Sequence, residues 1–235
     1  MKKIMLSIMV TALAGSAFAI DRYELDQRIR LFEGKFEAFQ AVAGKGIAPS
    51  TLKAARGIVL LDRTKAGLVF AYQGGNGVAM VRDRKTGVWG PAAFIKANEA
   101  SLGVQAGGEQ NFYVILLMDD AAVQRLTEAN FKFSGEARGT AGDASGGVTG
   151  DINSRRDGVI VYVDRQGFFG GASLKGGSIA PNTDANRIYY DHFATMQDIL
   201  FGNKEQPSDA SRGLAATLDK YSVDKYSAAN SRPGS

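Results

Sequence analysis

The stretch Gly57-Ile58-Val59-Leu60-Leu61-Asp62 is a short apolar run bounded by a glycine and an aspartate. Runs of this kind predict β-strands, because branched side chains pack well on a pleated sheet and the flanking residues favour turns. Comparable runs rich in Val, Ile, Phe and Tyr occupy 67–73, 77–82, 88–96, 112–118, 159–163 and 168–174. The pattern therefore predicts a domain whose core is dominated by strands.

Two glycine-containing segments between these strands are expected to form hairpin turns. One is Gly75-Asn76-Gly77, and the other is the polar segment 83–87, Asp-Arg-Lys-Thr-Gly. The first also resembles the start of a dinucleotide-binding fingerprint, but Met80 stands where the third glycine belongs and no helix is expected after it. A nucleotide site is therefore not expected there.

Segments with helical periodicity precede and follow the predicted strands in the sequence. In 20–44, apolar residues recur at spacings of four and three, at Leu25, Ile29, Phe32, Phe36 and Phe39. The polar face of this helix is charge-balanced, which favours docking on its own domain or on a partner over lying in anionic headgroups. Further helices are expected at 49–57, at 119–130 behind an aspartate cap, at 184–202, and around Leu214 and Leu218.

These elements predict an α+β fold with one domain, an antiparallel β-sheet (sandwich or half-barrel) and packed flanking helices. The expected organisation is a signal peptide at 1–19, the amphipathic helix at 20–44, the domain proper at 45–202, and a polar, partly disordered tail at 203–235. No internal repeat or linker interrupts this order.

The first residues predict export. Lys2 and Lys3 precede the apolar stretch 4–13, and Ala17-Phe18-Ala19 has the form of a cleavage site, so we expect a secretory signal peptide cleaved after Ala19. The sequence has no cysteine, and it has no Asn-x-Ser/Thr acceptor, which favours a bacterial periplasm. The expected location is periplasmic or secreted, peripheral to a membrane.

Few residues suit catalysis. Because there is no cysteine and only one histidine, His192, a thiol nucleophile and a multi-histidine metal site are excluded. Ser50 and Lys53 match S-x-x-K, and 85–87 reads Lys-Thr-Gly, as in β-lactamases; the third motif should lie between them, yet 54–84 contains no serine. We expect no catalytic residue, metal or cofactor, and interpret His192 as structural.

The charge distribution indicates an anionic partner. Without Lys2 and Lys3 the net charge falls from +4 to +2, which does not argue for nucleic acid. Between 45 and 85, however, eight bases face two acids. The bases expected to contact lipid phosphates are Lys45, Lys53, Arg56, Lys65, Arg82, Arg84 and Lys85. Phe168 and Phe169, flanked by glycines, are candidates to insert into the lipid or to line an acyl groove, and the alternative is that they belong to the core.

Several short motifs follow one another in order between 45 and 202. They are AARGI at 54–58, KAG at 65–67, GNGV at 75–78, GVWGP at 87–91, GVQAG at 103–107, GFFGGASL at 167–174, and Tyr189-Tyr190 followed by DILFG at 198–202. In content, order and spacing this region resembles the SYLF domain, a lipid-binding family that includes a yeast actin-binding protein. Lys175 departs from the family, which tends to have an acidic residue after the Ser-Leu pair.

The resemblance implies a single domain with no known catalytic activity that binds membrane lipids, phosphoinositides in eukaryotic members. For an exported bacterial protein the expected partners are instead anionic phospholipids, phosphatidylglycerol or cardiolipin, or lipopolysaccharide. An alternative stays open, namely an envelope protein-interaction or scaffold module in which the 20–44 helix or the tail recruits a protein.

Overall fold

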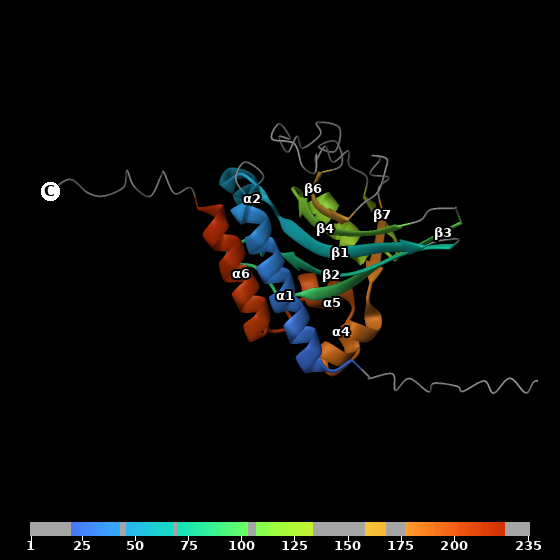
Figure 1. Ribbon diagram of the computed structural model, residues 1–235. Coiled ribbons are helices and arrows are strands. Elements are labelled where there is room, and N and C mark those ends of the chain that lie inside the picture. The colour runs from blue at the N-terminus through green and yellow to red at the C-terminus, as the bar shows by residue number, and fades with distance from the viewer. Residues whose placement is uncertain are drawn as a thin grey trace, which may run out of the picture.

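Figure 1 shows the computed structural model, which describes residues 20–42, 46–67, 70–102, 107–133, 158–167 and 177–223. The strands are β1 (Gly57–Gly67), β2 (Phe70–Val81), β3 (Ala93–Leu102), β4 (Gly107–Leu117), β5 (Phe131–Phe133), β6 (Val159–Gly167) and β7 (Gly177–Pro181). They form one antiparallel sheet in the order β5-β7-β3-β2-β1-β4-β6. The sheet curls into a half-barrel, which confirms the predicted fold class (Figure 1).

The first half of the interior strand β1 is buried on both of its faces. Ile58, Val59, Leu60 and Leu61 are all at most 1% exposed, although successive residues of a strand point to opposite sides. Ile58 and Leu60 belong to one core cluster and Val59 and Leu61 to the other. A strand covered on both sides has a continuous apolar run, which is why this stretch does not alternate with polar residues.

The first face of the sheet is covered by α1 (Arg22–Ala41) and α6 (Asp209–Ser222), which lie side by side in Figure 1. The helical face predicted from periodicity, Leu25, Ile29, Phe32, Phe36 and Phe39, is buried against the domain itself. Polar contacts join the two helices: the Thr217 hydroxyl donates to Glu33 (2.7 Å) and the Lys220 ammonium to Glu37 (2.9 Å). The amphipathic helix therefore docks on its own domain.

Short helices pack against the remaining parts of the sheet. They are α2 (Pro49–Ala54), α3 (Asp120–Gln124), the 3₁₀ turn η1 (Arg125–Thr127), α4 (Thr183–Tyr190) and α5 (Met196–Phe201). Ala185 and Tyr189 of α4 join the core beneath α1 and α6, whereas α3, η1 and α5 cover the second face. In the residues that the structure describes, no helix has the length and apolar character needed to cross a bilayer.

Several expected boundaries were wrong for local reasons. The segment 184–202 is two helices, because Asp191 adopts a left-handed conformation (φ 61°) and Thr195 starts α5 with a capping box to Asp198. The strand expected at 88–96 begins only at Ala93, after Pro91. The helix expected around Leu214 and Leu218 is present as α6, but both leucines are fully buried, so this segment is not part of a polar tail.

The expected hairpin at 75–77 was also wrong, because these residues lie within the continuous strand β2. Gly75 pairs with Arg63 and Gly77 with Leu61 of β1. A Cβ atom on Gly77 would meet the Leu60 carbonyl oxygen at 2.5 Å, so this glycine permits close approach of the strands rather than a turn.

Replacing Gly77 by alanine is expected to lower the free energy of unfolding by about 1–3 kcal/mol through overpacking. Gly34→Ala is the matched control. Gly34 is exposed in α1 with no atom within 4 Å of an added Cβ, so this change should stabilise the protein by about 0.5–1 kcal/mol. Urea unfolding of both variants measures the difference, and equal effects would contradict the close approach.

The buried side chain of Asn186 forms hydrogen bonds with the backbone of β3, as a neighbouring strand would. Its Oδ1 accepts from the Phe94 amide (2.7 Å) and its Nδ2 donates to the Phe94 carbonyl (3.1 Å). Asn186 is 1% exposed, so no bulk water reaches these groups.

Asn186→Leu is expected to destabilise the fold by about 1–3 kcal/mol, because it leaves the buried Phe94 amide without an acceptor, whereas the Phe94 carbonyl keeps the Asn182 amide (3.0 Å). Gln197→Leu, on the exposed side of α5, should change stability by less than about 0.5 kcal/mol. Urea midpoints of the two variants provide the test, and a loss of similar size at both positions would refute this role of Asn186.

Candidate functional site

A cavity of about 440 Å³ lies between α3, α5 and the turn that follows β2. Its apolar wall consists of Val81, Pro91, Val123, Ile199, Leu200 and Phe201. Its charged wall consists of Arg56, Arg82, Asp83, Arg84, Lys85 and Asp120. Four bases against two acids leave this wall with a net charge of +2.

Arg56 and Arg84 meet at one carboxylate, that of Asp120. Arg84 contacts both oxygens, with Nη2 at 2.6 Å from Oδ2 and Nε at 3.1 Å from Oδ1. Arg56 approaches more loosely, with Nη2 at 3.5 Å from Oδ1. The Asp120 side chain is 49% exposed, so these ion pairs are screened and weak.

The turn predicted at 83–87 is present, and it carries Arg84 and Lys85. The Asp83 carboxylate accepts from the amides of Thr86 (2.7 Å) and Lys85 (2.9 Å) and from the Thr86 hydroxyl (2.9 Å). These hydrogen bonds lower the pKa of Asp83. Gly87 closes the turn with a φ of +71°, which favours glycine.

Arg82 is held by the protein itself. Its guanidinium stacks on the buried Trp89 ring (4.3 Å), pairs with Asp219 of α6 (3.1 Å) and donates to the Gly87 carbonyl (3.1 Å). Burial lowers the pKa of Arg82, which the nearby Asp219 carboxylate opposes. Arg82 therefore links the cavity to α6 and has little freedom to reach a ligand.

The structure thus brings together Arg56, Arg82, Arg84 and Lys85 from the predicted lipid-binding set. Lys53 lies exposed on α2 and does not line the cavity. Lys65 lies on β1, and its side chain is outside the description. Lys45, Phe168 and Phe169 lie outside the described residues, so their predicted roles stay predictions.

Two features of the site were not predicted from the sequence. They are the Asp120 carboxylate between the two arginines, and the apolar wall of the cavity. Asp119 and Asp120 were both read as cap candidates; Asp119 caps α3 by accepting from the Ala122 amide (2.8 Å), whereas Asp120 faces the arginines. Arg56, Arg84 and Asp120 are far apart in the chain, so no sequence spacing could reveal their meeting.

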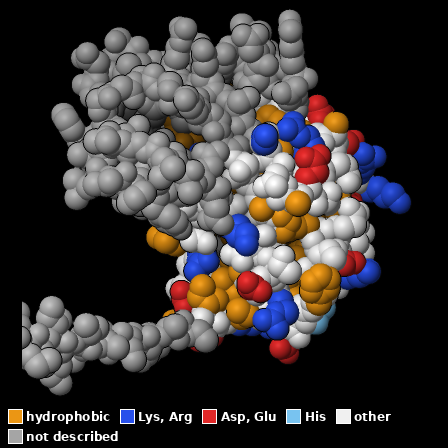
Figure 2. All heavy atoms as spheres, turned by 90° about the vertical axis from the view of Figure 1, so that its right-hand side faces the viewer, with side chains coloured by type: hydrophobic (Ala, Val, Ile, Leu, Met, Phe, Trp, Pro, Cys, Tyr) orange, Lys and Arg blue, Asp and Glu red, His pale blue; other side chains and the backbone are white. Residues whose placement is uncertain are grey.

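Among the described residues visible in Figure 2, basic side chains are scattered between acidic and apolar ones.

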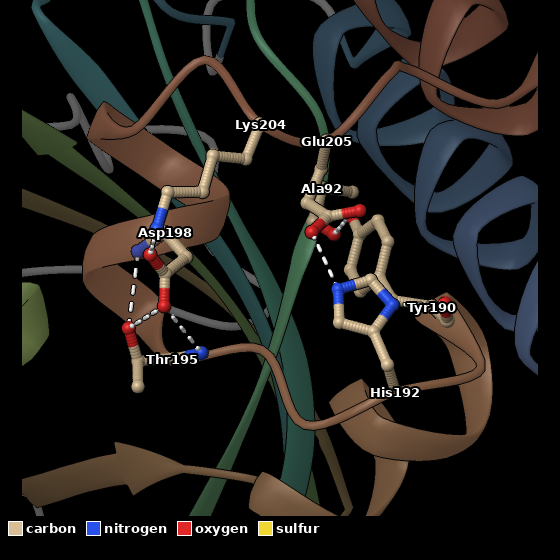
Figure 3. A network of polar contacts seen from close by, with 7 residues as sticks. All are labelled: Ala92, Tyr190, His192, Thr195, Asp198, Lys204 and Glu205. Carbon is tan, nitrogen blue, oxygen red and sulfur yellow. Dashed lines mark hydrogen bonds and ion pairs between the residues drawn. The ribbon is translucent and has the colours of Figure 1, made fainter.

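The single histidine lies between α4 and α5, and the prediction that it sits within a helix was wrong. Figure 3 shows its ring between two oxygen acceptors: Nδ1 is 2.7 Å from the Tyr190 carbonyl and Nε2 is 2.9 Å from Glu205. Both ring nitrogens are thus engaged in contacts within the protein. Among the described residues, no cluster of three His, Asp or Glu side chains could hold a metal.

A second contact in Figure 3 ties the chain after α5 back to that helix. Lys204 pairs with Asp198 (2.5 Å), and Thr195 donates its hydroxyl to the same carboxylate (2.6 Å). These contacts lower the pKa of Asp198 to about 2. They hold Asn203, which lines the cavity, close to α5.

The Tyr190 carbonyl and the Glu205 carboxylate raise the pKa of His192 above its ordinary 6.5. Charged His192 thus stabilises the fold fully below pH 6.5, and this contribution is lost as the pH rises through the folded-state pKa. His192→Gln should therefore lessen the fall in urea midpoint between pH 6 and pH 8, relative to the unchanged protein. NMR titration of this sole histidine checks the cause, and a pKa at or below 6.5 would contradict it.

Comparisons with known proteins indicate the same family as the sequence motifs. Residues 98–221 match the family described as Ysc84, Las17-binding protein actin regulator. Protein YSC84 of Saccharomyces cerevisiae is 30% identical over 176 residues, which are 72% of this chain and 36% of that protein. SH3 domain-containing YSC84-like protein 1 of Homo sapiens is 28% identical over 184 residues, 77% of this chain and 53% of that protein. No solved structure matches the chain significantly.

The chain spans between about a third and about half of the length of these relatives. The family description names a binding protein and regulator, which fits a family that is not enzymatic. Because the match at 98–221 covers more than half of its 235 residues, the chain belongs to the Ysc84 family, whose domain is the SYLF domain that its motifs indicate.

Proposed function

We propose that this protein binds anionic membrane lipids peripherally, without catalysis, after export to the periplasm or beyond. The export step is proposed from the N-terminal pattern of Lys2, Lys3 and the Ala17-Phe18-Ala19 site. The binding step is proposed from the cavity between α3 and α5.

The observation that carries this proposal is the pairing of two chemistries in one cavity. Arg56, Arg84 and Lys85 offer cationic groups suited to a phosphate, and the arginines can bind it through two parallel hydrogen bonds. Ile199, Leu200 and Phe201 offer apolar surface suited to the glycerol and the first carbons of an acyl chain. A phospholipid headgroup carries both features.

The strength of such binding follows from the charges. The charged wall carries +2, which equals the net charge of the whole chain without Lys2 and Lys3. Near an anionic bilayer each such charge contributes about 1 kcal/mol, enough to concentrate the protein at a surface without anchoring it. The association should therefore be reversible and sensitive to salt.

A second candidate is recruitment of an envelope protein. The family description names Las17 binding for its members, which supports a protein-binding role for the shared domain. Exposed apolar side chains on α1, Tyr23 (71%) and Leu31 (54%), offer a surface for such a partner.

Vesicle co-sedimentation tests the first proposal. The protein should pellet with vesicles that contain phosphatidylglycerol and not with pure phosphatidylcholine, and pelleting should fade at high salt. Absence of pelleting with either lipid at low salt would reject direct bilayer binding and favour the protein partner.

Lys85→Glu is expected to weaken binding to phosphatidylglycerol vesicles about thirtyfold, because it changes the charge of the cavity wall by two units at about 1 kcal/mol each. Lys96→Glu makes the same change at an exposed position on β3 outside the cavity, and its effect should be several times smaller. Equal effects would indicate general attraction to the surface rather than binding at the cavity.

A further inference from the structure

We propose that the carboxylate of Asp120 occupies the place of the ligand's phosphate group between Arg56 and Arg84, so that binding requires its displacement. The inference rests on the proposed function and specifies how the same cavity is regulated. Arg84 grips both oxygens of Asp120, at 2.6 and 3.1 Å. A phosphate offers a guanidinium the same pair of oxygens, so the two anions compete for one site.

The contacts of Asp120 are exchangeable. The side chains of Asp120 and Arg84 are 49% and 67% exposed, so water can replace either partner. Asp120 is not needed to cap α3, since the side chain of Asp119 does so. Arg82 differs, because its side chain is only 13% exposed and is held by Asp219 and Trp89.

The ligand class follows from what surrounds the arginines. A phosphate ester satisfies Arg56 and Arg84, and the apolar wall at Ile199, Leu200 and Phe201 favours an ester that carries acyl chains. A lipid headgroup and a soluble phosphate ester share the phosphate chemistry, and only the lipid also uses the apolar wall.

Asp209 provides a closely matched control for Asp120. Each is the first residue of a helix, α6 and α3 respectively, each is exposed, and each pairs with an arginine, Arg212 in the case of Asp209. Asp209 does not line the cavity. Asp209→Asn therefore removes the same charge and releases an arginine away from the site.

The experiment measures affinity for phosphatidylglycerol vesicles in Asp120→Asn, Asp209→Asn, Arg84→Gln and the double variant Asp120→Asn/Arg84→Gln. Asp120→Asn should tighten binding about fivefold, the factor that corresponds to one charge near an anionic bilayer. Asp209→Asn should stay within about twofold, the scatter allowed for a distant, independent site. In the Arg84→Gln background, Asp120→Asn should tighten binding by clearly less than fivefold, since Arg84 is gone and only the looser contact of Arg56 remains to be released.

Glycerol 3-phosphate, followed through the arginine Nε resonances in NMR, separates the two proposals. Tighter binding of this ester by Asp120→Asn, without vesicle binding by any variant, would keep the displacement and refute the lipid function. Vesicle binding by the unchanged protein that Asp120→Asn does not tighten, or tightens equally with and without Arg84, would overturn the displacement and leave the lipid function standing.

Discussion

Burial of β1 on both faces is the constraint on which the rest of this structure depends. Four consecutive apolar side chains, 58–61, alternate between two core clusters, so the sheet needs cover on each side. Leaving either face in water would expose apolar surface at about 25 cal/mol per Å². The long pair α1 and α6 covers one face, and Lys35 of α1 forms an ion pair with Asp62 of β1.

The second face is covered differently, and the cavity is a consequence. The helical pieces there, α3, η1 and α5, have five, three and six residues, against 20 in α1. Helices of one or two turns cover less area than α1 and α6 do, and the hollow lies between α3 and α5. The end of β2 and the turn after it border this hollow, which brings Arg82, Arg84 and Lys85 to its wall.

Sequence patterns predicted the structural features that depend on residues close together in the chain. The stripe from Leu25 to Phe39, the Asp83–Gly87 turn and the Asp119 cap are local, and all three are present. The strand through Gly75 and Gly77 was read as a turn, because the cause of these glycines is the close backbone of β1, which no local pattern records. The same distinction holds for the site. Its bases were predicted from the sequence, whereas the ion pair of Arg84 with Asp120 depends on tertiary packing.

Two of the ion pairs made by the arginines of the cavity, Arg82 with Asp219 and Arg84 with Asp120, have the same chemistry and different consequences. Arg82 is 13% exposed and contacts Trp89, Asp219 and a backbone carbonyl, so removal of the Asp219 carboxylate would leave a partly desolvated cation without this counter-charge. The pair of Arg84 and Asp120 is solvated on both sides, and pairs of this kind contribute about 1 kcal/mol or less. A bidentate contact between an arginine and a phosphate contributes more than about 1 kcal/mol when apolar surface is buried together with it. The cavity therefore combines one cation fixed for structure with others that an incoming phosphate can take over at little cost to the fold.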